Sequence, residues 1–504
     1  MKAPLAPGLR GAAIVFCAAL VATSAYSKRS TSAATTTTRR RPAGPSAQLS
    51  RELTGGNGVF IGTAIPVNLK RAGYVQHEYA ASGTATSYSA TAPLSSDGLW
   101  SFAPDAQAPY RTRILVRQPA DPARFSGNVV VEWLNVSGGV DADPEWATTH
   151  EEILRRGDVW VGVSAQRIGV LGGPVLVRVD APGAENAGKG LKAIDPARYG
   201  SLDHPGDGFA FDIYTQVARA IRSGARLGGL RVKRVIAAGE SQSAFALVTY
   251  YNGVQPLTRA FDGFFVHSRG AIGLPLVAAG ASADIAGSIS GTPAVFRGDQ
   301  DAPVLDVQTE SDLTSVLNSY AARQPDSDRF RLWEVPGTAH ADAHLIGSTA
   351  TRLDCGVPIN NGPLHVVAKA ALHALTTWVE SGKAPPTAER IDVAAAGSPQ
   401  IQRNADGIAL GGIRTPPVDV PVAALTGTPG PNPSVICLLL GSTTPLSDQR
   451  LGELYPRRTA YLRQYDADAD KAIRAGFVLR DDRAALRAFA DALEHPGLTR
   501  LQDR

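Results

Sequence analysis

The stretch RVKRVIAAGESQSAFALVTYYN constrains the fold of this chain more than any other. A run of β-branched and small apolar residues, Val232 to Ala238, ends at Gly239, Ser241 follows two residues later, and an apolar stretch compatible with a helix begins after Ser243. Strand, sharp turn, serine and helix are the layout of a nucleophile elbow. The turn needs small neighbours on both sides of the serine, and Ser243 takes the place where a glycine is usual. The pattern predicts a Ser241 hydroxyl that projects above the end of a sheet.

Strand and helix patterns alternate on both sides of this turn. Repeated alternation predicts an α/β fold, with a mostly parallel central sheet and helices on both faces. In such sheets the reactive residues lie at the carboxyl ends of the strands. The strands are expected in NVVVEWLN, DVWVGVSA, FDGFFVHS, PVLDVQTE and FRLWEVPG, and the helices in 144–156, 209–223 and 364–382.

A serine hydroxyl is too weakly acidic to attack unaided, so it needs a base and an orienting carboxylate. His340 follows the last predicted strand in VPGTAHAD, and it is our candidate base. The segment PVLDVQTESD offers Glu310 and Asp312 at the end of the preceding strand, and both satisfy the chain order of serine, acid and histidine. We favour Asp312, which lies just past the strand, with Glu310 as the alternative.

Two backbone N–H groups are needed to bind an oxyanion. The Gln242 N–H lies near the predicted helix N-terminus and is the first candidate. The second is expected from NVSGG after the 128–134 strand, where glycines let the backbone approach a ligand. Val136 and Ser137 are the candidates in this loop.

Other side chains are candidates for a substrate pocket. His267 and Arg269 follow the end of the strand after the elbow helix, and Trp146 lies near the presumed mouth. His340 and His344 are four residues apart in HADAH, the spacing of a metal pair on a helix, but the sequence shows no third ligand. We therefore expect no metal and no cofactor.

Sequence composition divides the chain of 504 residues into four parts. Residues 1–25 combine basic residues, an apolar run and small residues, which is the plan of a secretory signal, and the run is short for a membrane span. Residues 26–52 lack apolar periodicity and are predicted to be a disordered linker. Residues 53–385 are expected to form the catalytic domain, and 386–504 a C-terminal extension packed on it.

The predicted signal places the mature protein outside the cell or in the cell envelope, with no stable membrane span. A net charge of +4 on a chain of this length gives no indication of nucleic-acid binding. Removal of the signal leaves Cys355 and Cys437, which an oxidising compartment would join in a disulfide; the alternative is two separate buried thiols.

The order of strands, GESQSA, QTESD and GTAHAD resembles the alpha/beta-hydrolase superfamily. More closely, the chain resembles a bacterial family of alpha/beta-hydrolase domain proteins from about Gly55 to the C-terminus. The resemblance implies a serine hydrolase with Ser241 as nucleophile and His340 as base, and it names no ester. The segments that carry it are VVVEWLNVSGG, WVGVSAQRIGV, RYGSLDHPGD, GESQSAF, RQPDSDRFRLWEVPGTAHAD and LGGIRTPPVDVPVA.

These observations predict an exported serine hydrolase that cleaves a small-molecule or lipid carboxylic ester through an acyl-enzyme on Ser241. The Glu240-Ser241 pair is similar to the elbows of carboxylesterases, which favours ester chemistry. One alternative is an acyltransferase, because an alcohol can resolve the same acyl-enzyme in place of water. Another is a non-catalytic surface binding protein that uses an inherited fold.

Overall fold

The computed structural model describes residues 41–62, 65–179, 183–314, 316–394 and 399–492. The predicted signal segment, 1–25, and the first part of the predicted linker lie outside these residues. The last part of the linker is not disordered, which corrects the prediction for 26–52. There β1 (Gln48–Glu52) pairs with β2 in antiparallel fashion, and the N–H of Ala47 bonds to a backbone carbonyl of a neighbouring helix. β1 is the edge strand of the sheet and its residues are exposed or half-buried, so no apolar periodicity marks it in the sequence.

The core of the fold is a nine-stranded sheet with the order β1-β2-β3-β5-β4-β6-β7-β8-β9. The strands from β5 to β9 pair in parallel, whereas β1, β2 and β3 form an antiparallel edge. The predicted mostly parallel sheet is therefore confirmed. The strands after β1 are β2 (Tyr74–Ala90), β3 (Phe102–Pro119), β4 (Asn128–Trp133), β5 (Val159–Val163), β6 (Arg234–Glu240), β7 (Gly263–His267), β8 (Val304–Thr309) and β9 (Phe330–Val335).

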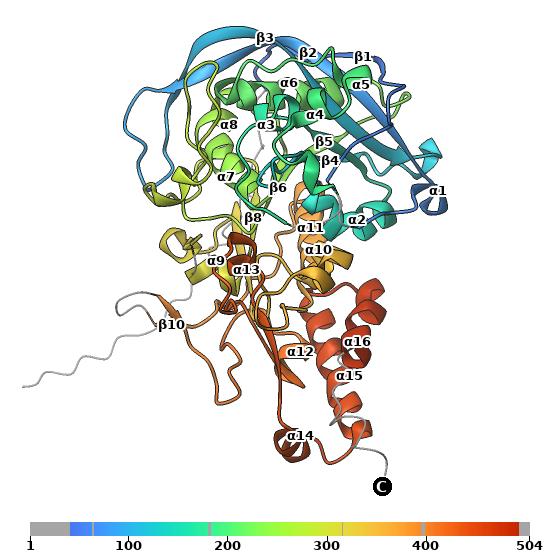
Figure 1. Ribbon diagram of the computed structural model, residues 1–504, viewed down its shortest axis with the longest axis vertical. Helices are drawn as coiled ribbons and strands as arrows, with labels where there is room; N and C mark the ends of the chain where they lie inside the picture. The colour runs from blue at the N-terminus through green and yellow to red at the C-terminus, as the bar shows by residue number, and fades with distance from the viewer. Residues whose placement is uncertain (1–40, 63–64, 180–182, 315, 395–398, 493–504) are drawn as a thin grey trace, which may run out of the picture. The chain divides into compact units, whose positions relative to one another are not determined.

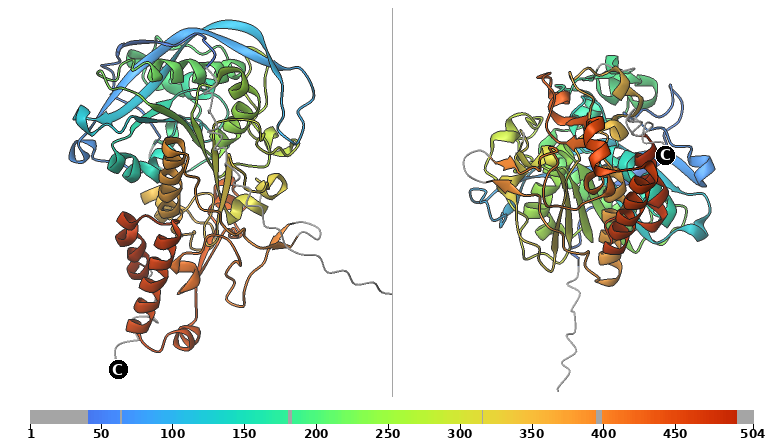
Figure 2. Two further views of the ribbon diagram at one scale, coloured as in Figure 1. Left: turned by 180° about the vertical axis from the view of Figure 1, so that it is seen from behind. Right: turned by 90° about the horizontal axis from the view of Figure 1, so that it is seen from below.

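Helices cover both faces of the sheet, as predicted (Figures 1 and 2). In β6, Val235 and Ala237 join the apolar core on one face, while Ile236 and Ala238 join the core on the other. A strand buried on both faces needs apolar residues at every position, which explains the unbroken apolar runs in the sequence. The first core contains α6 (Ala210–Arg222) and α7 (Gln242–Thr249), and the second contains α2 (Pro144–Arg156) and α11 (Leu364–Ser381).

Short helices lie in the connections between these elements. A π-helical turn, Tyr250–Val254, joins α7 to α8 (Gln255–Thr258). None of the helices within the described ranges is long and apolar enough to cross a bilayer. The other short helices are α1 (Leu69–Ala72), α3 (Arg167–Leu171), α4 (Gly190–Ile194), α5 (Pro196–Tyr199), α9 (Glu310–Thr314) and α10 (Ala343–Ile346).

The segment after α11 has a small apolar core of its own, built around Tyr461 and Tyr465, to which α11 contributes Val366. Buried charges also join it to the sheet domain, because Asp482 accepts from Arg155 of α2 and Lys369 of α11 at 2.7 and 3.0 Å. The structure forms one compact unit from Arg41 onward. The elements here are β10 (Val393–Ala394), β11 (Gln400–Ile401), α12 (Pro416–Asp419), β12 (Ala423–Thr426), α13 (Val435–Leu439), β13 (Ser442–Pro445), α14 (Asp448–Leu454), α15 (Arg458–Ala475) and α16 (Arg483–Ala492).

A disulfide joins Cys355 to Cys437 across a sequence separation of 82 residues, with the Cα atoms 5.4 Å apart. Cys437 lies in α13, and Cys355 lies in the loop that leads to α11. The cystine packs in an apolar cluster with Ala341 and Leu440. It therefore fixes part of the C-terminal segment beside the loop that follows β9.

Replacement of Cys355 and Cys437 together by serine should lower the free energy of unfolding by about 2–4 kcal/mol, because the unfolded chain regains the freedom of a long loop. Denaturant unfolding of both proteins, with and without a reductant, measures the effect. The reductant should destabilise the native protein and leave the double variant unchanged. Equal sensitivity of the two proteins would contradict the prediction.

Candidate active site

The turn between β6 and α7 has the geometry of a nucleophile elbow. Ser241 has φ 59° and ψ −123°, a backbone conformation that residues other than glycine rarely adopt. Its N–H donates to the carbonyl of His267 at 2.9 Å. A Cβ atom at Gly239 would lie 3.0 Å from the carbonyl carbon of Ser243, so a side chain at position 239 would crowd the start of α7. The turn therefore holds the Ser241 hydroxyl at the carboxyl end of the sheet.

Ser241, His340 and Asp312 meet at this edge. The Oγ of Ser241 lies 2.8 Å from Nε2 of His340, and Nδ1 of His340 lies 2.7 Å from Oδ1 of Asp312. His340 follows the end of β9, and Asp312 lies in α9, directly after β8. The three residues are far apart in the sequence, and the parallel strands bring them together because the strands end at one edge.

Local hydrogen bonds orient the imidazole and the carboxylate. The backbone N–H and the hydroxyl of Thr309 donate to Oδ2 of Asp312 at 2.7 and 2.8 Å. The N–H of His340 donates to Oγ of Ser311 at 2.7 Å. The side chains therefore have little freedom to turn away from one another.

The charges in this triad support each other. Burial alone would raise the pKa of Asp312, but the His340 imidazole and the Thr309 donors outweigh it and lower that pKa. Burial alone would lower the pKa of His340, but the Asp312 carboxylate raises it above its ordinary value. Asp312 thus stays ionised and binds the Nδ1–H of His340, which leaves Nε2 to accept a proton from Ser241.

Glu310, the alternative acid, has a different set of partners. Its carboxylate accepts from the N–H groups of Gly337 and Gly427 at 2.6 and 3.0 Å and from Arg403 at 2.6 Å. It therefore ties the start of α9 to the turn before His340 and to the C-terminal segment. Asp312, and not Glu310, is the carboxylate that contacts the imidazole.

The predicted oxyanion donors differ in what they already bind. The N–H of Ser137 donates to the side chain of Asn135 at 2.8 Å, so it is occupied within its own loop. The N–H of Val136 lies 3.4 Å from Oε1 of Gln242, at the long limit of a hydrogen bond. Gln242 is the first residue of α7, where a backbone N–H has no partner inside the helix. Val136 and Gln242 therefore remain the candidate pair.

A network of amides that the sequence analysis did not identify holds this loop against the elbow. The side-chain amide of Gln242 donates to Oε1 of Gln166 at 2.7 Å, and the indole of Trp133 donates to the same oxygen at 2.9 Å. Asn135 donates to the backbone carbonyl of Glu240 at 3.1 Å. Gln166 and Asn135 are polar residues just beyond the ends of β5 and β4, and that position was the signal that could have identified them.

Two of the predicted pocket residues have structural partners instead. The ring of Trp146 packs against Trp160 with centroids 5.4 Å apart, and the guanidinium of Arg117 lies 4.4 Å from its centroid. The side chain is fully buried in the core beneath α2 and α11. The prediction that Trp146 lines the pocket is wrong, because the first turn of α2 directs this ring into the core.

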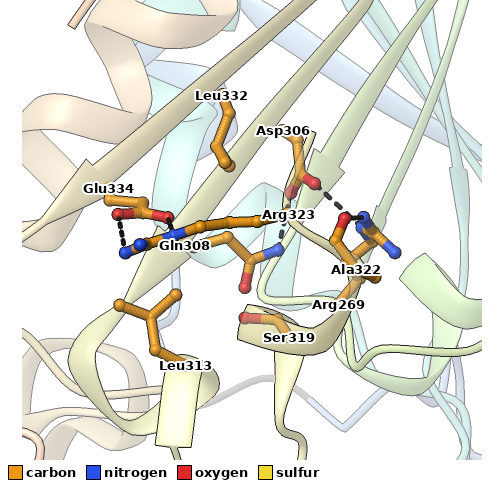
Figure 3. A pocket seen from close by; sticks show the side chains of 9 residues that line it. All are labelled: Arg269, Asp306, Gln308, Leu313, Ser319, Ala322, Arg323, Leu332 and Glu334. Carbon is orange, nitrogen blue, oxygen red and sulfur yellow. Dashed lines mark hydrogen bonds and ion pairs between the residues drawn. The ribbon is translucent and has the colours of Figure 1, made fainter. Parts of the chain in front are cut away.

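Arg269 is likewise buried and paired, so its prediction as a substrate-pocket residue is also wrong. Its guanidinium donates to Asp306 at 2.8 Å and to the carbonyls of Ala294 and Ala322 at 3.1 and 2.9 Å. Figure 3 shows it among a layer of polar side chains between β8, β9 and α9. The hollow among them has no room for a water molecule. The layer packs against β8, the strand that precedes Asp312.

The larger hollow, of about 360 Å³, is remote from the triad. Its lining includes Lys233, Arg234 and Pro303, at the starts of β6 and β8, so it lies at the amino ends of the strands, opposite the triad.

Within the part of the chain that the structure describes, no group of three or more acidic, histidine or cysteine side chains could hold a metal. His344 stacks on His365 with ring centroids 3.7 Å apart.

His267 lies closer to the triad than the other predicted pocket residues. It ends β7 next to Glu240, its register partner on β6. Its Nδ1 lies 3.3 Å from Oε1 of Glu145 on α2, and the side chain is 2% exposed. It is therefore buried behind the nucleophile and does not line an open pocket.

A family model described as "Alpha/beta hydrolase domain" matches residues 42–488. The chain belongs to this family. The match includes the strands, the elbow and most of the C-terminal segment, so the resemblance inferred from the motifs is confirmed. A comparison with curated proteins found no match.

Solved structures with detectable similarity include several serine hydrolases and esterases. One is an α/β serine hydrolase without lid from Xanthomonas campestris, with 13% identity, 58% of this chain and 95% of that chain covered, and a TM-score of 0.30. Est1E from Butyrivibrio proteoclasticus has 10% identity, with 59% and 100% covered and a TM-score of 0.29. An esterase from the fungus Rhizomucor miehei has 12% identity, with 60% and 86% covered and a TM-score of 0.29. The fold assignment depends on the family match and the sheet topology.

The backbone strain at Ser241 predicts a measurable difference between two substitutions. Ser241→Gly should be more stable than Ser241→Ala by about 1 kcal/mol, because glycine adopts a positive φ without strain and alanine does not. Urea unfolding of the two variants gives the difference. A glycine variant that is less stable than the alanine variant would show that the turn stores no strain.

Proposed function

We propose that this protein is an exported serine hydrolase that cleaves carboxylic esters through an acyl-enzyme on Ser241. The observation that carries the proposal is the continuous chain of contacts from the Ser241 hydroxyl through the His340 imidazole to the Asp312 carboxylate. Membership of the alpha/beta hydrolase family supports hydrolase chemistry. The Cys355–Cys437 disulfide supports export, because such bonds persist in oxidising compartments.

The reaction begins when the Ser241 Oγ attacks the ester carbonyl while Nε2 of His340 takes its proton. Asp312 stabilises the imidazolium that forms. The negative oxygen of the tetrahedral intermediate binds the N–H groups of Gln242 and Val136. The long contact between Val136 and the Gln242 side chain is weak enough for the oxyanion to replace it.

Collapse of the intermediate breaks the ester bond, and His340 gives its proton to the leaving alcohol. Water then attacks the acyl-enzyme with His340 as general base and releases the acid. The chemistry needs no cofactor. We propose a small-molecule or lipid ester as substrate, since Ser241 is partly exposed whereas His340 and Asp312 are buried.

Ser241→Ala should abolish both ester hydrolysis and labelling by a fluorophosphonate, because the alanine has no nucleophile. A panel of p-nitrophenyl esters of graded chain length, with added alcohols in parallel, measures hydrolysis and transfer to an acceptor. Labelling that persists in the alanine variant would reject Ser241 as the nucleophile. An absence of turnover over the whole panel, with no labelling of the native protein, would favour a binding protein.

The two carboxylates make a matched pair for a second test. Asp312→Asn should lower kcat by about 10³–10⁴, because the imidazole loses the partner that fixes its tautomer. Glu310→Gln should keep kcat within about tenfold and lower the free energy of unfolding, because it weakens bonds to two backbone N–H groups and to Arg403. The opposite ranking of the two kcat values would make Glu310 the acid.

A further inference from the structure

A second carboxyl group lies close to the reactive nitrogen of His340 and has no part in the mechanism above. Glu240 is the last residue of β6, immediately before the nucleophile. Its Oε1 lies 3.5 Å from Nε2 of His340, the same nitrogen that faces the Ser241 hydroxyl. The side chain of Glu240 is 5% exposed, so bulk water screens this contact little.

Glu240 lies between two imidazoles. His267 is its direct partner in the parallel pairing of β6 with β7. Nδ1 of His267 lies within ion-pair distance of Oε1 of Glu145, at 3.3 Å, and neither ring nitrogen has a hydrogen-bond partner among the described residues. The order of groups is therefore Glu145, His267, Glu240, His340 and Asp312.

Charged or titratable groups from several elements surround this row. Glu240 of β6 interacts with His340, His267, Glu145 and Asp312, and His267 of β7 also interacts with Asp342. Burial raises the pKa of Glu240 to about 7, and the two imidazoles limit the increase. Burial alone would lower the pKa of His267, but Glu145 and Glu240 outweigh it and raise that pKa to about 9. The two carboxyl groups therefore favour the charged form of His267.

A cationic His267 opposes protonation of His340, because two like charges would then lie in one buried site. The Glu240 carboxylate lies between them and attracts both. When His340 takes the Ser241 proton, the imidazolium has the Glu240 carboxyl group on its Nε2 side and the Asp312 carboxylate on its Nδ1 side. Without Glu240, the imidazolium that forms in the reaction would face His267 with no intervening anion.

We propose that Glu240 is a positioning residue that stabilises the imidazolium of His340 from its Nε2 side, and that His267, beside Glu145, favours the charged form of the Glu240 carboxyl group. This inference rests on the proposed function, since it concerns the base of that reaction. No proton passes to Glu240. The proton of Ser241 moves to His340, as before, and the carboxylate acts through its charge alone.

The test uses the pH dependence of the rate at which a fluorophosphonate labels Ser241, together with kcat/KM for a p-nitrophenyl ester. In Glu240→Gln, the acid limb of both profiles should move to lower pH by about one unit, a tenfold change in proton affinity. The plateau should fall about tenfold, because the base becomes weaker. Glu240→Asp keeps the charge and should retain a limb close to that of the native protein.

A second substitution tests the role of His267. In the Glu240→Gln background, His267→Gln removes the opposing cation, so the limb should move back toward the native position. Such recovery marks a direct coupling between the two sites. If His267→Gln caused only a structural defect, the acid limb of the double variant would stay at the position measured for Glu240→Gln.

Asp158→Asn is the matched control, because Asp158 is a buried carboxylate at the start of β5, hydrogen-bonded to Ser126 and Asn128. Its acid limb should coincide with that of the native protein. An unmoved limb in Glu240→Gln, with complete labelling of Ser241, overturns the proposal. If the native protein is not labelled at all, the proposed function itself fails. That outcome is distinct from an unmoved limb, which rejects only the role of Glu240.

A measurement on the native protein covers the case in which Glu240→Gln does not fold. An NMR titration of the histidine side chains should show His267 protonated at neutral pH, with its transition near the pKa of about 9. A neutral His267 at pH 7 overturns the proposal, because no cation would then hold Glu240 in its ionised form.

Discussion

The parallel pairing of β6, β7, β8 and β9 is the constraint on which the whole site depends. These strands end at one edge of the sheet, so the residues that follow them meet although they are far apart along the chain. Ser241 follows β6, Asp312 lies just after β8 and His340 follows β9. The strained backbone of Ser241 places the hydroxyl at the one point that the imidazole reaches, and the apolar cores on both faces hold the strands in register.

The C-terminal segment is part of this arrangement. Glu310 and Arg403 connect α9 to it, and Asn360 donates to the carbonyls of Gly337 and Thr426 at 3.1 Å each. These bonds fix the turn that carries His340 from the side opposite the sheet. A short loop with a catalytic side chain needs such support, because a displacement of about 1 Å can reduce a rate a hundredfold. The segment thus supports the turn that carries His340.

Buried charged groups lie close to the triad. Asp306 with Arg269, and Glu334 with Arg323, neutralise one another beneath the acid (Figure 3). In the row from Glu145 to Asp312, carboxyl groups lie beside both imidazoles, and they raise the pKa of His267 and of His340 against the effect of burial. Burial of such groups is expensive unless each has a partner, and active sites are where proteins retain them.

Much of the site could be predicted from the sequence, because its parts are local patterns. Apolar runs identify strands, small residues around Ser241 identify the turn, and a histidine after the last strand identifies the base. Two errors show the limit. Trp146 and Arg269 follow strand ends or begin a helix near the expected mouth, yet both side chains point into the protein. Position along the chain does not tell in which direction a side chain points.

The sequence by itself determined the fold class and predicted Ser241 as nucleophile and His340 as base, since each pattern is encoded within a few consecutive residues. Only the tertiary structure showed that Asp312, and not Glu310, contacts the imidazole, joined β1 to the sheet and placed Glu240 near two imidazoles. The reason is physical. Those outcomes depend on distances between segments that are far apart in the chain, and only the packing and register of the folded sheet determine such distances.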